Sequence, residues 1–229
     1  MFPFMFDWTW ILLLPAIGLA LWAQAKVRGT YNKYSQVFSR GRMTGAQVAR
    51  RILDANGLID IRVEAVEGTL SDHYHPKEKV VRLSKPIYGS NSLAALAVAA
   101  HETGHAMQDK MGYAPMAIRA RLVPVAGFGS TLAFPLFFIG LFIPSIGWLM
   151  DVAIIFFAGA VLFHLVTLPV EFDASRRAVA ILSSGGYLAP DELPQAKKVL
   201  NAAAWTYVAA ATVALIHLVR LLVLRQSRD

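Results

Sequence analysis

Four long hydrophobic runs dominate the chain, at residues 8–25, 122–143, 148–168 and 199–219. A helix needs about 20 consecutive apolar residues to cross the hydrocarbon core of a bilayer, so each run predicts one span. Residues 144–147, Pro-Ser-Ile-Gly, supply a turn, so the second and third spans should form a hairpin whose two ends return to the same side. We expect a mainly α membrane protein with about four transmembrane helices.

The polar residues after the first run predict a small α+β portion. Residues 44–56 carry apolar side chains at helical spacing, with Thr44 placed to cap the start of a helix and Gly57 its end. Three extended segments predict a small antiparallel sheet, at residues 61–66, 69–74 and 79–83. Residues 92–108 then predict a helix that is apolar for most of its length.

The segment between the hairpin and the last run predicts two helices. Pro169 stands just before an acidic group at Glu171, which is typical of a helix N-terminus. Gly185 and Gly186 should end that helix, and residues 191–198 predict a short polar helix leading into the last run.

Basic residues set the predicted orientation. Seven Lys and Arg residues lie between residues 26 and 51, so the positive-inside rule puts this segment in the cytoplasm and the N-terminus outside. A cleaved signal peptide is the alternative, but no Lys or Arg precedes the first run, and an uncleaved anchor is expected. Arg220, Arg225 and Arg228 conflict with this topology, because four spans place them outside although such charges prefer the cytoplasm.

Composition supports a membrane protein and excludes several chemistries. With 56% hydrophobic residues, 16% charged residues and a mean hydropathy of +0.48, the chain is too apolar for an ordinary soluble domain. It has no cysteine, so a disulfide framework and a thiolate zinc site are both excluded. The net charge is +7, and many of the basic residues lie beside the first run. The lipid bilayer with its anionic headgroups is therefore the expected partner, and nucleic acid is not.

The stretch His101-Glu102-Thr103-Gly104-His105 carries the candidate chemistry. Residues i and i+4 share one face of a helix, so His101 and His105 can bind one metal ion with Glu102 beside them. Two imidazoles suit Zn²⁺, a third protein ligand leaves one position for water, and Glu102 can take the proton of that water. The alternative is a pair of buried core histidines. It offers no packing reason for polar residues at one end of an otherwise apolar helix.

Glu171 is the candidate third ligand. A metzincin is excluded, because Gln108 and Met111 occupy the positions of its Gly and third His. A thermolysin-like Glu about twenty residues after the motif is absent, since no Glu lies between Glu102 and Glu171. The predicted hairpin returns Glu171 to the membrane face of the histidines. Its alternative role is a first-turn charge that complements the helix dipole.

The neighbours of Glu171 predict how a ligand is supported. Ser175 lies at i+4 on the same helical face and can orient a ligand by hydrogen bonding. Asp173 is expected to point away from that face. Arg176 and Arg177 are expected at lipid phosphates or the protein surface.

Four stretches resemble the YugP-like bacterial membrane zinc metallopeptidases: LSDHYHP, RLSKPIYGS, AAHETGHAMQ and LPVEFDASRRA. The layout is also similar to the wider gluzincin membrane proteases, including the HtpX and CAAX-processing type, over nearly the whole chain. The resemblance implies zinc held by His101, His105 and Glu171, with Glu102 as general base and proton donor. One departure is Ser175, since HtpX-type enzymes usually carry Asp at that position.

Two polar groups keep open roles. His164 is the one titratable residue deep in the third run, where it is either a functional group or a histidine bonded to a neighbouring helix. Residues 72–75, Asp-His-Tyr-His, either support an oxyanion or form a solvated turn. His75 also stands where Asp is common in the resembled family.

Together the residues and the resemblance predict an integral membrane zinc-dependent endopeptidase of the gluzincin type. It would hydrolyse peptide bonds of membrane or membrane-adjacent proteins through a zinc-activated water, in a bacterial inner membrane with the active site facing the cytoplasm. One alternative is a catalytically inactive metal-binding scaffold or chaperone-like subunit, for which Glu102 would be dispensable. A metal transporter is disfavoured, because it should need ligands inside several spans. Oligomeric state and regulatory partners are not predicted.

The predicted parts follow one another along the chain. They are an N-terminal transmembrane anchor (1–25), a cytoplasmic zincin-like α+β portion with the HETGH helix (26–121), a transmembrane helical hairpin (122–168), a cytoplasmic segment with the third zinc ligand (169–198), and a C-terminal transmembrane helix with a basic tail (199–229).

Overall fold

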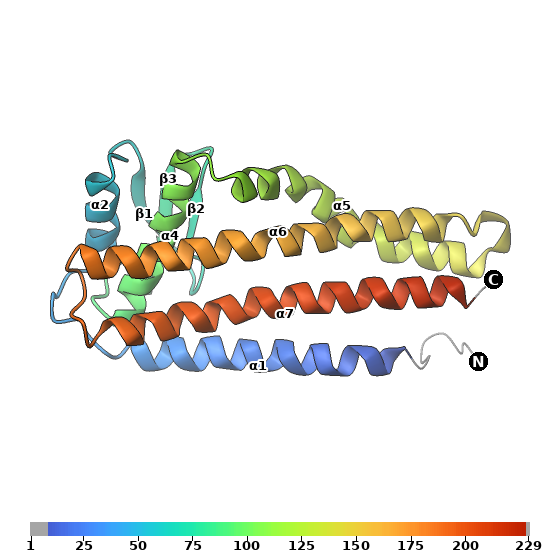
Figure 1. The fold of residues 1–229 in the computed structure, drawn as a ribbon, viewed down its shortest axis with the longest axis horizontal. Coiled ribbons are helices and arrows are strands. Elements are labelled where there is room, and N and C mark those ends of the chain that lie inside the picture. The colour runs from blue at the N-terminus through green and yellow to red at the C-terminus, as the bar shows by residue number, and fades with distance from the viewer. Residues whose placement is uncertain (1–8, 228–229) are drawn as a thin grey trace. The chain divides into compact units, whose positions relative to one another are not determined.

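A computed structural model describes residues 9–227 (Figure 1). These residues form two units. The helical unit comprises residues 9–24, 117–168 and 206–227. The site unit comprises residues 25–116 and 169–205. Residue 8 of the first predicted run and Arg228 of the basic tail lie outside the described residues.

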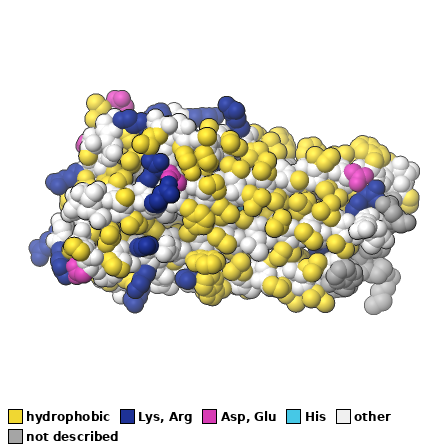
Figure 2. Space-filling model, in the orientation of Figure 1, with side chains coloured by type: hydrophobic (Ala, Val, Ile, Leu, Met, Phe, Trp, Pro, Cys, Tyr) yellow, Lys and Arg dark blue, Asp and Glu magenta, His cyan; other side chains and the backbone are white. Residues whose placement is uncertain are grey.

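Within residues 9–227, four helices are long and apolar enough to cross a membrane, which confirms the predicted number of candidate spans. They are α1 (Trp10–Tyr34), α5 (Ala114–Phe142), α6 (Leu149–Ser184) and α7 (Leu193–Gln226), and a short 3₁₀ turn, η2 (Pro144–Ile146), connects α5 to α6. Figure 2 shows hydrophobic side chains over most of the visible face of the helical unit, as expected of a surface that contacts lipid tails.

The helix boundary predicted at Pro169 is wrong. The structure shows α6 continuing through Pro169 without a break. Proline removes one backbone hydrogen bond, whereas nucleating a new helix fixes several residues to gain its first bond, so continuation costs less. Glu171 therefore lies inside a long helix, and the alternative role of complementing a helix N-terminus does not apply. The polar helix predicted before the last run is likewise part of one continuous helix, α7.

Close backbone contacts hold α5 against α6 in the helical unit. A Cβ atom added to Gly129 would lie 2.3 Å from the carbonyl oxygen of Phe156, and one added to Gly140 would lie 2.9 Å from the backbone nitrogen of Met150. Membrane helices associate through such close packing at small residues, because lipid tails provide no hydrophobic driving force between them.

The arginines near the end of α7 have partners within the helical unit. The Nε atom of Arg225 donates to Asp151 Oδ1 at 2.9 Å. The Nε atom of Arg220 donates to Thr9 Oγ1 at 2.9 Å, and the guanidinium lies 4.4 Å from the centre of the Trp10 ring. These contacts give both cations a local reason for their position, so their charge alone is weak evidence against a fourth span.

The site unit contains a three-stranded sheet and several helices. In chain order the elements are α2 (Gly45–Ala55), β1 (Arg62–Val66), β2 (His73–His75), β3 (Val80–Ser84), α3 (Lys85–Tyr88) and α4 (Leu93–Lys110). The strand order is β1-β3-β2, with β3 parallel to β1 and antiparallel to β2. The prediction of an antiparallel sheet is therefore wrong for the pairing of β1 with β3. In the β1–β2 link, Gly68 and Leu70 adopt φ angles of +99° and +58°, and the chain passes the position of β3 to reach the far edge.

Side-chain caps begin the two main helices of the site unit. Thr44 Oγ1 accepts from the backbone N–H of Gln47, whose side chain accepts from the Thr44 N–H in return, so α2 starts with a capping box. Ser92 accepts from the N–H of Ala95 and caps α4. At the other end of α2, the C-cap is Asn56 rather than the predicted Gly57. Gly57 follows it and adopts a left-handed φ of +63°.

Candidate metal centre

Helices α4 and α6 bring His101, His105 and Glu171 together. One donor atom from each residue lies within 4.8 Å of the donor atoms of the other two. The Oε2 atom of Glu171 is 3.2 Å from His101 Nε2 and 3.6 Å from His105 Nε2. The three side chains therefore share one site, although 171 − 105 = 66 positions separate Glu171 from His105.

The two separations between Glu171 and the histidine nitrogens fit a tetrahedral zinc ion. Zinc bonds to histidine nitrogen and carboxylate oxygen are about 2.0–2.2 Å long, and at tetrahedral angles such bonds place neighbouring donors about 3.3 Å apart. The two nitrogen–oxygen distances, 3.2 and 3.6 Å, bracket that value. The Glu171 side chain is only 2% exposed, and a buried carboxylate needs a cationic partner. A nitrogen and oxygen donor set of this kind suits zinc.

Gly104 allows α4 to approach α6 at this point. A Cβ atom at Gly104 would lie 2.8 Å from the carbonyl oxygen of Ala174 on α6, closer than real Cβ atoms pack. Glycine inside a helix costs roughly 0.5–1 kcal/mol relative to alanine. The close approach explains why that cost is tolerated here, since it sets the distance from His105 to Glu171.

Gln108 fixes the orientation of His105. Its Nε2 atom donates to the carbonyl oxygen of Val170 at 2.8 Å and to Asp173 Oδ2 at 3.0 Å, so its Oε1 atom is the one that faces His105. The Nδ1 atom of His105 lies 2.9 Å from that oxygen and donates to it. The Nε2 atom of His105 then carries the free lone pair and points toward Glu171, as a metal ligand requires.

Replacing Gln108 with Leu is expected to weaken zinc binding by about 10–100-fold, the usual effect of losing a group that orients a metal-binding histidine. Titration against a chromophoric chelator measures this affinity. Gln195→Leu is the matched control, because the Gln195 amide donates to the backbone carbonyl of Asp191. Equal zinc affinities for Gln108→Leu and wild type would show that His105 needs no such support.

Ser175 and Asp173 complete the surroundings of the donors. Ser175 Oγ lies 3.2 Å from His101 Nδ1, as predicted for a residue that orients a ligand. Asp173 contacts the site through Gln108, and it pairs with both Arg176 and Arg177, the latter at 2.5 Å. The expectation that Asp173 points away from the ligand-bearing face missed its contact with Gln108, because that contact comes from α4, whereas Arg176 and Arg177 are i+3 and i+4 neighbours on its own helix.

Glu102 lies on α4 beside His101 and is buried, as is typical of a carboxylate that acts as a general base. It is 8% exposed, and none of the side-chain hydrogen bonds within residues 9–227 involves its carboxylate. Burial by itself lowers the pKa of His105, but the hydrogen bond with Glu171 and the charges of Glu102 and Glu171 outweigh it and raise that pKa. The carboxylates of Glu102 and Glu171 therefore stabilise a positive charge near His105. A bound metal cation would supply such a charge.

Comparison with known proteins identifies the family. The defining pattern of the family described as "Putative neutral zinc metallopeptidase" matches residues 9–226. The chain belongs to this family. Its relative "Putative membrane protease YugP" of Bacillus subtilis (strain 168) is 48% identical over 219 residues, which cover 95% of this chain and 97% of the relative. No solved structure matches the chain.

The polar side chains at residues 72–75 are held in local contacts. Asp72 accepts hydrogen bonds from the backbone and hydroxyl of Ser84, and burial raises the pKa of Asp72. Tyr74 donates to Asp109 Oδ2 at 2.8 Å, and burial together with that carboxylate raises the pKa of Tyr74. His75 Nδ1 accepts from the N–H of Glu78. These contacts explain the polar residues structurally and leave the oxyanion donor unassigned.

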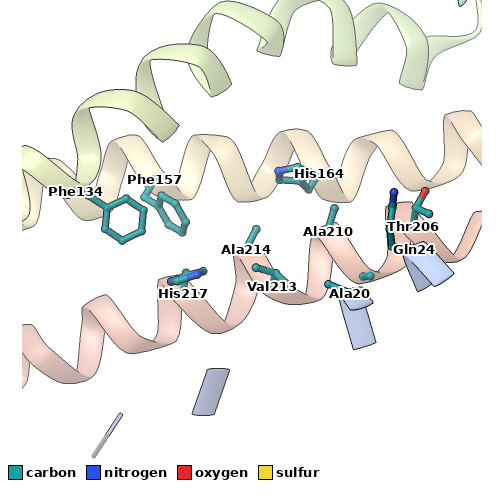
Figure 3. A pocket seen from close by; sticks show the side chains of 11 residues that line it. Ala20, Gln24, Phe134, Phe157, His164, Thr206, Ala210, Val213, Ala214 and His217 are labelled. Carbon is teal, nitrogen blue, oxygen red and sulfur yellow. The ribbon is translucent and has the colours of Figure 1, made fainter. Parts of the chain in front are cut away.

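His164 lies in a pocket that contains none of the three candidate donors. Figure 3 shows it on α6, lining a pocket of about 450 Å³ in the helical unit together with His217 of α7. Phe134 and Phe157 contact the His217 ring at 5.6 and 6.4 Å between ring centres. The sequence analysis singled out His164 and missed His217, whose signal was its place inside the last apolar run. Neither histidine is among the three donors of the metal centre.

Proposed function

We propose that the protein is an integral membrane zinc-dependent endopeptidase of the gluzincin type. Its zinc ligands are His101, His105 and Glu171, and its catalytic residue is Glu102. The observation that carries this proposal is the clustering of three donor atoms from His101, His105 and Glu171 within 4.8 Å of one another, with Glu102 on the same helix as the two histidines. Family membership and the name of the relative, a membrane protease, support the same conclusion.

The chemistry divides between the metal and the residues of this chain. A bound zinc ion supplies a Lewis acid for the scissile carbonyl and lowers the pKa of water. Glu102 accepts the proton of the attacking water and passes it to the leaving amine, so one carboxylate serves as base and then as acid. Gln108 and Ser175 hold the two imidazoles in the orientation that presents Nε2 to the metal.

The substrate of this endopeptidase is a membrane or membrane-adjacent protein in an extended conformation. Strand β2 is an edge of the sheet and packs against α4, which carries the histidines. An edge strand offers unpaired backbone groups, so an extended peptide can pair with β2 by main-chain hydrogen bonds. Binding of this kind depends little on side chains and suits substrates of varied sequence.

The decisive experiment is metal removal from detergent-purified protein. We expect about one zinc ion per chain, cleavage of an unfolded protein such as casein, loss of cleavage after chelation and recovery on adding zinc. Mass-spectrometric metal analysis and gel-based cleavage give the two readouts. Bound zinc without cleavage of any unfolded protein or peptide would instead favour a metal-binding scaffold.

The active site is proposed to face the cytoplasm of a bacterial inner membrane. Because the chain has no cysteine, single cysteines can report topology without background. We expect Lys77→Cys, exposed in the site unit, to resist a membrane-impermeant thiol reagent in intact spheroplasts and to react after lysis. Ser145→Cys, exposed in the hairpin turn, is the matched control and should react in intact spheroplasts. The reverse pattern would place the metal centre outside.

A further inference from the structure

A second pocket, separate from the metal centre, lies in the site unit between α1 and α7. Its volume is about 490 Å³. The side chains of Lys26 and Lys33 on α1 and of Lys198 on α7 line it, and no acidic residue is among the described residues of its wall. Three ammonium groups around one pocket should attract an anion, because each adds to the same positive potential.

The other wall residues suit a phosphate group held near apolar material. Thr30 and Asn201 add a hydroxyl and an amide that can donate hydrogen bonds. The Lys26 ammonium lies 5.8 Å from the ring centre of Trp205, and the Lys33 ammonium lies 5.5 Å from that of Tyr34. Lysine, Trp and Tyr together are typical of the level where a helix leaves the hydrocarbon and enters the headgroup region.

The sequence places the pocket at that level on both helices. The first apolar run ends at residue 25, directly before Lys26, and the last apolar run begins at residue 199, directly after Lys198. Each lysine is therefore the first charge next to one of the two apolar runs, on the long helix that contains that run. The location does not raise the local concentration of a free phosphate ion. A phospholipid headgroup, in contrast, is concentrated at this level by its own acyl chains.

From these observations we infer that the pocket binds the phosphate-bearing headgroup of an anionic phospholipid. The inference does not depend on the proposed hydrolysis, because none of its residues belongs to the metal centre. It gives the expected interaction with anionic lipid a defined site, formed by three lysines.

Charge-removing variants test the site in detergent-purified, full-length protein by native mass spectrometry with added phosphatidylglycerol. Each lysine near an anionic surface contributes enough to expect about fivefold weaker lipid retention when it is removed, and Lys26→Gln/Lys198→Gln should lose about 25-fold. Lys197→Gln is the matched control, because Lys197 is exposed on the same helix but does not line the pocket. Equal losses for Lys197→Gln and Lys198→Gln would overturn the inference in favour of general surface charge.

A steric variant tests the same site without changing charge. Gly29 lines the pocket, and a Cβ atom added there meets nothing within 4 Å, so Gly29→Leu should fill the space and reduce phosphatidylglycerol retention at least fivefold. Gly18→Leu is its control, because a Cβ atom at Gly18 of the same helix also meets nothing and Gly18 is not in the pocket wall. Unchanged retention in Gly29→Leu would overturn the inference, as would displacement of the lipid by equimolar inorganic phosphate.

Discussion

Replacing Glu102 with Gln is expected to lower the rate of peptide-bond hydrolysis by about 10²–10⁴-fold, the usual contribution of a positioned general base. The amide keeps the size and hydrogen-bonding capacity of the side chain but cannot accept a proton from water. Zinc content should stay at about one ion per chain, because Glu102 is not among the three clustered donors. Initial rates of casein cleavage and metal analysis of the same preparation give both quantities.

The matched control for this prediction is Glu78→Gln. Glu78 is exposed in the site unit and pairs with Arg82, so its replacement makes the same chemical change away from the metal centre. Its cleavage rate should equal that of wild type. A Glu102→Gln protein that cleaves at the wild-type rate would remove the proposed base and leave metal binding as the only supported property of the site.

Glu171→Gln is expected to lose both zinc and activity. Glu171 is the one carboxylate among the three donors, and its oxygen lies closest to the two imidazoles. Removing a residue that only supports a ligand weakens zinc binding about 10–100-fold, so removing the charge of a ligand itself should weaken it by more than about 100-fold. Competition with a chelator of graded affinity measures the loss.

The two Glu→Gln variants control for each other, since both change one buried carboxylate of the same site into an amide. Zinc retained in Glu102→Gln and lost in Glu171→Gln would distinguish a base from a ligand. Circular dichroism of both proteins checks that each remains folded. Zinc retained in Glu171→Gln would mean that another residue completes the donor set.

The four candidate spans were predictable because their signal is local. A run of about 20 apolar residues needs no knowledge of the partner helices, and the caps at Thr44 and Ser92 are equally local. Pro169 shows the limit of such rules. Its presence indicates a possible boundary, but the structure keeps α6 continuous because interrupting a long helix costs more than one missing hydrogen bond.

The sheet was predicted less well because strand order depends on distant contacts. Residues 61–66 and 79–83 were correctly read as extended, yet the parallel pairing of β1 with β3 follows from the path of the link through Gly68 and Leu70. Nothing in the alternation of side chains distinguishes this order from an antiparallel meander.

The three candidate donors could be named from the sequence, and the structure brings them together, whereas the side chains around them were only partly predictable. His101 and His105 follow from helical spacing, and Glu171 from the absence of another Glu before it. Gln108 gave no such signal, because its role depends on the close approach of α4 to Val170 and Asp173 on α6. Contacts between two helices far apart in sequence are the part that a single sequence does not contain.

The separation of the donors along the chain also has a consequence for biosynthesis. His101 and His105 are translated before the helical hairpin, and Glu171 only after both of its limbs, 66 residues later than His105. At about 5–20 residues per second, the ribosome takes roughly 3–13 s to cover that interval. During this time the nascent chain has two of its three proposed donors, so the candidate metal centre can form only once the hairpin has been made.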